Sequence, residues 1–315
     1  MTFADPSQAT PANAAAKPIA ASAAPARVRD LRLDFFRGIA MFIILMAHTP
    51  GNFLTSWIPA GWGFSDATEI FVFCSGMASA IAFGRGYDVA GWRLASAHVG
   101  LFFATLALTV ALTNSGLGTR NYWGQLNLWP LFVESDKWTN PDILLSFMTL
   151  RYVPNYFDIL PMYMIVLLLM PIIMALANVN KWLVGAFIAT VWFFAQRKIM
   201  DSLGLSHLYI GFPAEPWTER PWFFNPFSWQ LIFFTGFAFM RGWLPKPPVS
   251  KTLILFATFL VIANIPLSNI GVREFGFEWA RDVRAVIKPL IDKSSFGILR
   301  YVHFLALAYL CWVAA

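Results

Sequence analysis

A series of apolar runs dominates this sequence, and each run is close to the length that a helix needs to cross a lipid bilayer. Only 13% of the 315 residues are charged and 58% are hydrophobic, whereas ordinary soluble domains carry about 25% charged residues. A soluble core of this size has too little volume to bury so much apolar surface. We therefore expect an all-α fold, a polytopic transmembrane helix bundle.

We expect about 8–10 spans, joined by irregular or re-entrant external loops. The apolar runs lie near 35–57, 67–84, 94–113, 159–177, 182–196, 227–241, 252–267 and 297–315. Pro50-Gly51 interrupts the first of them. The last run reaches Ala315 without a polar flank, so we expect the natural chain to continue beyond it.

The formal charge of +6 reflects basic residues that mostly stand between apolar runs, where they orient a chain in the membrane. We therefore expect membrane lipid as a partner and no nucleic acid. Residues 1–30 are rich in Ala, Pro and Ser and predict a disordered tail ahead of the membrane domain at 31–315. Arg27, Arg29 and Arg32 precede the first run and place this tail in the cytoplasm.

Segment 268–296 does not follow the positive-inside rule. Counting the spans from a cytoplasmic N-terminus places this segment outside the cytoplasm, although it contains several basic residues. Apolar residues recur in it at helical spacing, which predicts an amphipathic helix at the membrane surface. These residues are Trp279, Val283, Val286, Ile287 and Leu290.

Two further loops, 114–158 and 197–226, are rich in aromatic residues. Such residues form belts at the bilayer surface, but their flat faces also stack on sugar rings, and the sequence leaves both interpretations open. The residues concerned are Tyr122, Trp123, Trp129, Trp138, Trp217, Trp222 and Trp229.

Ionisable residues are costly inside a membrane and mark functional sites by default, and the first run contains Asp34, Arg37 and His48. Arg37 and His48 are eleven residues apart, which places both side chains on one helix face, separated by about 16 Å of rise. Arginine binds phosphate and histidine transfers protons near neutral pH. This stripe can bind an acyl-CoA whose phosphates contact Arg37 while its thioester reaches His48.

The second run opens with Asp66 and Glu69, at the end where the first run places His48. We expect Glu69, or alternatively Asp66, to accept a hydrogen bond from His48 and hold its tautomer. Acidic residues also stabilise a first helical turn without any catalytic role. Ser75-Gly76 is most simply a small-residue packing site. Cys74 and Cys311 lie in apolar runs and predict no disulfide framework or metal cluster.

An Arg, ten residues and a His in the first span are the hallmark of acyltransferase family 3, and Arg37–His48 has this spacing. The surrounding sequence resembles the OpgC family more closely, from about residue 31 to residue 315. The resemblance lies in Leu33-Asp34-Phe-Phe-Arg37-Gly38, Ala67-Thr-Glu69-Ile-Phe-Val-Phe with Ser75-Gly76, Asp158-Ile-Leu-Pro161-Met-Tyr163, Asn225-Pro226-Phe-Ser-Trp229-Gln230 and Arg300-Tyr-Val-His303-Phe.

This resemblance implies succinylation of osmoregulated periplasmic glucans by a bacterial inner-membrane enzyme. It makes His48 the catalytic base and Arg37 a donor-binding residue. We expect Glu69 and Asp66 to act beside His48, and Asp34 and Ser75 to lie at the acyl donor with Arg37. Succinyl-CoA, or another acyl-CoA, would be a co-substrate, with no permanently bound cofactor and no metal. The polar residues of the other blocks would bind the acceptor on the periplasmic side: Arg151, Asp158, Asn225, Trp229, Gln230, Arg300 and His303.

Two other classes stay open at this stage, as does homo-oligomerisation. Asp34, Arg37, His48 and Glu69 can also form the proton relay of a proton-coupled or sugar transporter. In a structural or sensory membrane protein the buried charges would pair with one another without facing a cavity. Helix capping is the simplest alternative for Asp158 and Asn225.

Overall fold

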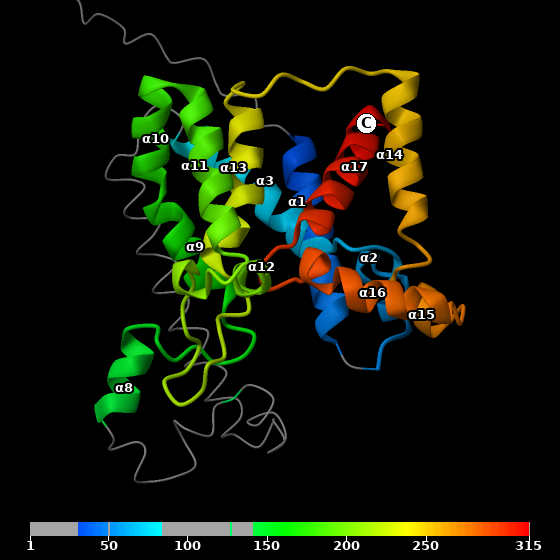
Figure 1. The fold of residues 1–315 in the computed structure, drawn as a ribbon. Coiled ribbons are helices and arrows are strands. Elements are labelled where there is room, and N and C mark those ends of the chain that lie inside the picture. Colours follow the sequence, from blue (N-terminus) through cyan, green and yellow to red (C-terminus); the bar gives the residue numbers. More distant parts are fainter. Residues whose placement is uncertain (1–30, 50, 84–126, 128–140, 315) are drawn as a thin grey trace, which may run out of the picture. The chain divides into compact units, whose positions relative to one another are not determined.

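The computed structural model describes residues 31–49, 51–83, 127 and 141–314, and in these ranges all regular elements are helices (Figure 1). Pro213 and Pro221 form an isolated antiparallel bridge. The predicted all-α class is confirmed for these residues. The predicted tail at 1–30 and the run at 94–113 lie outside them.

The helical elements follow one another along the chain. They are α1 (Leu31–His48), η1 (Phe53–Trp57), α2 (Pro59–Trp62), α3 (Ala67–Phe83), α8 (Pro141–Met148), α9 (Ile159–Leu168), α10 (Met170–Val179), α11 (Lys181–Phe194), α12 (Arg197–Ser202), η3 (Ser206–Leu208), α13 (Pro226–Met240), α14 (Lys251–Ala263), α15 (Asn269–Arg273), α16 (Glu278–Ile291) and α17 (Ile298–Ala314).

The predicted apolar runs form helices wherever the structure describes them, with one correction at the first run. Helix α1 ends at His48 rather than near residue 57, because proline lacks the N–H that a helix needs and Pro50 disfavours helical backbone before it. The stretch Ile159–Val179, which combines α9 and α10, is long and apolar enough to cross a membrane. The other apolar helices of the described ranges are shorter.

Helix α13 is the centre of the core, and its side chains from Ser228 to Ala238 are buried. It packs against α3, α9 and α11. Its closest approach is to α3, where Gly76 of α3 and Gly236 of α13 each face a backbone carbonyl of the other helix. A methyl group on Gly76 would overlap the carbonyl oxygen of Phe233, and a methyl group on Gly236 would overlap the carbonyl oxygen of Phe73. Small residues allow this approach, as at many helix contacts in membrane proteins.

We expect Gly76→Ala to lower the free energy of unfolding by about 1–3 kcal/mol, since the added methyl group must push α3 and α13 apart. Thermal unfolding of the detergent-solubilised protein measures the change. Gly185→Ala in α11 is the matched control, because open space surrounds that position and alanine favours helix. Equal unfolding temperatures for both variants would contradict the close contact.

The amphipathic helix predicted within 268–296 is present as α16. Val286 and Trp279 are exposed on it, and Arg284 donates hydrogen bonds to the Leu267 carbonyl and Asn269 Oδ1, which tie α16 to α15. In Figure 1, α16 runs across the direction of α14 and α17. The chain then turns into α17, which carries Arg300 and His303.

Candidate functional site

Hydrogen bonds and a ring contact connect the segments in which several helices begin. The Phe223 N–H, just before α13, donates to Asp158 Oδ1 at the start of α9. The Asn225 N–H donates to the Ser294 carbonyl in the segment before α17, 3.2 Å away. The Tyr156 ring packs edge-on against His48 with centroids 5.6 Å apart. These contacts connect the segments before α9, α13 and α17 and place His48 against Tyr156.

Two acidic side chains at the start of α3 and two basic side chains near the start of α17 form a buried ionic cluster. Arg300 Nε lies 2.7 Å from Glu69 Oε1, and its Nη2 lies 2.5 Å from the same oxygen. Asp66 Oδ2 accepts from Lys293 Nζ at 2.7 Å and from Arg300 Nη2 at 3.3 Å. Glu69 has no exposed side-chain surface, and the Arg300 side chain is only 10% exposed. We name these four residues the ionic cluster.

The backbone around the ionic cluster gives it further hydrogen bonds. Glu69 Oε2 accepts from the Asp66 N–H at 2.8 Å, and Asp66 Oδ1 accepts from the Thr68 N–H at 2.7 Å. Burial alone would raise the pKa of Asp66, but the charges of Lys293 and Arg300 outweigh burial and hold that pKa well below its usual range. Asp66 is therefore ionised throughout the physiological pH range.

His303 extends this region by one turn of α17. Its Nδ1 lies 2.7 Å from Ser65 Oγ and accepts from the Ser65 N–H at 3.3 Å. Gly63 lies directly against the imidazole, where any side chain would overlap the ring. His303 is thereby held in one orientation, with Nδ1 as the acceptor.

The structure gives His48 a different partner from the predicted one. Its Nδ1 lies 2.8 Å from the Ile44 carbonyl, and because a carbonyl only accepts, Nδ1 carries the hydrogen in the neutral ring. Nε2 is then the free base. Glu69 is bonded to Arg300 instead, so the predicted pairing of Glu69 with His48 is wrong; the Ile44 carbonyl sets the tautomer.

Arg37 lies on the packed stripe of α1, half-buried, together with the fully buried Ala40. It is close enough to Cys74 of α3 and Tyr163 of α9 to interact with them electrostatically. Its Nε is buried and has no hydrogen-bond partner within the described ranges. Asp34 is half-buried on the same helix, whereas Ser75 donates to the Phe71 carbonyl of its own helix at 2.8 Å.

The predicted acceptor residues of α13 make contacts within the protein, although Gln230 Oε1 is buried without a hydrogen-bond partner among the described residues. Asn225 caps the helix by accepting from the Phe227 N–H at 3.0 Å, as the capping alternative predicts. Trp229 is fully buried and donates to the Lys293 carbonyl at 3.0 Å, so its ring has no free face for a sugar. Gln230 is also fully buried, and its Nε2 donates to the Ile188 carbonyl at 2.7 Å.

Asp158 and Arg151 precede α9 in very different surroundings. Asp158 is buried, and burial raises the pKa of its carboxyl to about 6 although the Phe223 N–H and the charge of Arg220 oppose the shift. It stands at the N-cap position of α9 without making a side-chain capping bond. Arg151 is exposed and lines a surface hollow together with residues of α8.

Of the aromatic residues in the two predicted loops, Trp222 is buried against Phe212, and Trp217 is 44% exposed beside Tyr152. Buried Trp222 and Trp229 therefore serve as core residues, not as a belt or a sugar platform. The remaining candidates lie outside the described ranges: Tyr122, Trp123, Trp129 and Trp138.

Sequence reasoning missed Ser65 and Lys293. Lys293 belongs to the basic segment that conflicts with the positive-inside rule, and that conflict was the available signal for it. Ser65 carries no comparable signal, because its role depends on His303, which is 238 residues away.

Over the described residues these features define an all-helical fold with a candidate membrane-spanning helix and a largely buried, charged site at the starts of α3 and α17. The chain belongs to the OpgC protein family, whose model matches residues 29–315. No curated protein and no solved structure matches the chain. Family membership favours a transferase that takes part in glucan modification and does not favour the transporter alternative.

Proposed function

We propose that this protein transfers a succinyl group from succinyl-CoA to a hydroxyl group of a periplasmic glucan. The match to the OpgC protein family over residues 29–315 carries this proposal. The contacts that join polar residues of separate matched blocks, such as Arg300 and Glu69, support it. The protein would lie in the inner membrane with its N-terminus in the cytoplasm and the starts of α3 and α17 on the periplasmic side.

In the proposed reaction His48 is the general base. Its Nε2 removes the proton of a glucan hydroxyl, and the oxygen attacks the carbonyl carbon of the thioester. A C–O bond forms as the C–S bond breaks, and the CoA thiolate leaves with the proton that His48 has taken up. The bond from Nδ1 to the Ile44 carbonyl supports this role, because it directs the basic lone pair to Nε2.

Arg37 would bind the phosphates of the donor. Its guanidinium is always charged and matches phosphate oxygens in a fork, and its buried Nε has no hydrogen-bond partner within the described residues. A buried donor without a partner is uncommon and favours an absent ligand. Arg37 and His48 share one face of α1 about 16 Å apart along its axis, so an extended pantetheine arm can span the two.

The ionic cluster would position the site instead of taking part in proton transfer. Glu69 and Asp66 bind Arg300 and Lys293, which joins the start of α3 to the start of α17 and the segment before it. The charges of Lys293 and Arg300 keep Asp66 ionised, and the oxygens of Glu69 accept hydrogen bonds from Arg300 and from the Asp66 N–H, so neither carboxylate is free to act as a general base. We therefore assign Glu69, Asp66 and Arg300 as positioning residues.

A transfer assay with the purified protein in nanodiscs tests the proposal. The protein is incubated with succinyl-CoA and a neutral glucan oligosaccharide, and the products are analysed by mass spectrometry. We expect an anionic glucan ester and free CoA in equal amounts, with acetyl-CoA in parallel to identify the acyl group. Release of CoA without glucan substitution would contradict the acceptor, and no product from either donor would contradict acyl transfer.

A further inference from the structure

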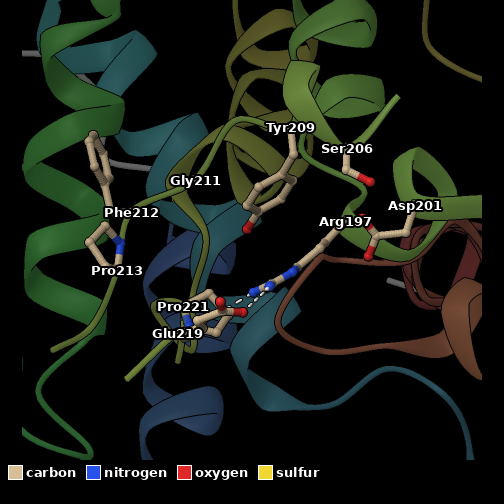
Figure 2. A pocket seen from close by; sticks show the side chains of 9 residues that line it. All are labelled: Arg197, Asp201, Ser206, Tyr209, Gly211, Phe212, Pro213, Glu219 and Pro221. Atoms are coloured by element: carbon tan, nitrogen blue, oxygen red, sulfur yellow. Dashed lines mark hydrogen bonds and ion pairs between the residues drawn. The ribbon is translucent and has the colours of Figure 1, made fainter. Parts of the chain in front are cut away.

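A surface hollow of about 320 Å³ lies between α12, η3 and the chain that leads to α13 (Figure 2). Its volume is at the lower end of the range of small-molecule sites, so it suits one unit of a longer ligand. The lining residues are Arg197, Asp201, Ser206, Tyr209, Gly211, Phe212, Pro213, Glu219 and Pro221.

The wall of the hollow is held in place by several contacts. Arg197 donates to the carbonyl and to the side chain of Glu219, at 3.2 and 3.3 Å, and its guanidinium lies 5.9 Å from the Tyr209 ring centroid. Figure 2 shows Arg197 reaching from the side of Tyr209 to Glu219 across the hollow. Gly211 lies directly against the end of the Tyr209 side chain, where an added methyl group would displace the Tyr209 ring.

The segment around Pro213 and Pro221 closes on itself and forms the opposite wall. The Ala214 N–H donates to the Arg220 carbonyl at 2.7 Å, and the Trp222 N–H donates to the Phe212 carbonyl at 2.9 Å. Arg220 in turn binds Asn155 Oδ1 at 3.0 Å and Glu215 Oε2 at 3.4 Å. The hollow is therefore preorganised, which reduces the entropy cost of binding.

The hollow is connected to the candidate site through Asn225. The amide of Asn225 donates to the Ile210 carbonyl at 3.0 Å and to the Tyr209 hydroxyl at 3.4 Å. The same residue donates through its backbone to the Ser294 carbonyl, next to Lys293 of the ionic cluster. A ligand in the hollow thus lies against the segment that supports the site.

The charges of the lining select against anions. Asp201 and Glu219 carry two negative charges against the single positive charge of Arg197, which already binds Glu219. Carboxylates accept hydrogen bonds from hydroxyl groups, while the hydroxyls of Ser206 and Tyr209 both donate and accept. This set fits a neutral molecule rich in hydroxyl groups and repels phosphate or carboxylate ligands.

From these observations we infer that the hollow binds one unsubstituted sugar unit of the acceptor glucan. The inference rests on the proposed function for the identity of the glucan. It also implies that a succinylated unit binds more weakly than a neutral one, since its added carboxylate faces Asp201 and Glu219. The hollow would then retain unmodified glucan and release a unit that has been acylated.

Binding of a neutral glucose tetrasaccharide to the purified full chain in nanodiscs tests this inference, with saturation-transfer NMR as the readout. We expect Asp201→Ala and Ser206→Ala each to weaken binding about tenfold, the effect of losing a hydrogen bond to a sugar hydroxyl. Asp282→Ala is the matched control, because Asp282 is an exposed aspartate of α16 that lines neither this hollow nor the one at Arg151. Equal binding by all four proteins, or no binding by the wild type, would overturn the inference.

The transfer assay separates this inference from the proposed function. If Asp201→Ala and Ser206→Ala raise the KM for glucan and leave the KM for the acyl-CoA unchanged, the hollow is an acceptor site. If both variants transfer with an unchanged glucan KM, the hollow is not such a site, while the transferase activity stands. If the wild type binds the tetrasaccharide at the hollow but transfers no acyl group, the sugar site stands and the proposed function fails.

Discussion

His48→Ala is expected to reduce acyl transfer to glucan at least about 100-fold, the usual contribution of a general base. The change removes Nε2, the only atom of this side chain whose lone pair is free, because Nδ1 is bonded to the Ile44 carbonyl. His48 is exposed at the end of α1, so the variant should keep its unfolding temperature within a few degrees. Product mass spectrometry and thermal unfolding on the same preparation measure both effects.

Thr49→Ala is the control for His48→Ala. Thr49 is the next residue and is also exposed, and its hydroxyl donates to the Leu45 carbonyl at 2.8 Å, so its loss disturbs the same helix end without removing a base. We expect this variant to keep nearly full transfer activity. If a folded His48→Ala protein acylates glucan at the wild-type level, His48 is not the base. If His48→Ala and Thr49→Ala lose the same transfer activity, the role of His48 is structural.

The largest effect on stability is expected from Arg300→Met. Removal of the guanidinium leaves Glu69, which has no exposed side-chain surface, as an uncompensated buried carboxylate. Breaking a buried ion pair in this way costs about 3–5 kcal/mol, and the free energy of unfolding should fall by that amount. Denaturant titration of the detergent-solubilised protein measures it.

The double variant Glu69→Gln/Arg300→Met separates the ion pair from the packing of the arginine stem. We expect it to be more stable than Arg300→Met alone, because the neutral amide leaves no unpaired charge at this position of α3. Arg197→Met is the surface control, since Glu219 is 93% exposed and such pairs contribute about 0–1 kcal/mol. A loss in Arg300→Met no larger than in this control would show that the cluster does not stabilise the fold.

Much of the local structure follows from patterns within short stretches of the chain. The apolar runs predict α3, α9 with α10, α11, α13, α14 and α17 to within a few residues, because burial or lipid contact demands about the same length of apolar sequence in each. The spacing of Trp279, Val283 and Val286 predicts α16 for a similar reason, since a helix repeats every 3.6 residues. Family membership was also apparent from ordered blocks of sequence.

The contacts between these stretches were not predictable in the same way. The order of the apolar runs predicts that the last turn of α1, with His48, and the first turn of α3, with Glu69, lie on the same side of the membrane, yet Glu69 pairs with Arg300, 231 residues away. Trp229 stands among the matched polar residues but is buried under the segment before α17. Periodicity places a side chain on one face of its own helix and contains no information about which helix covers that face.

The amino-acid sequence was thus sufficient to predict the fold class, most of the apolar helices, the polar residues worth testing and the family. Which of those residues touch became apparent only from the three-dimensional arrangement, which also added Ser65, marked by no local pattern, and Lys293, marked only by its conflict with the positive-inside rule. The difference is one of range. Helix formation depends on neighbours within a few turns, whereas ion pairing and packing depend on how distant segments meet.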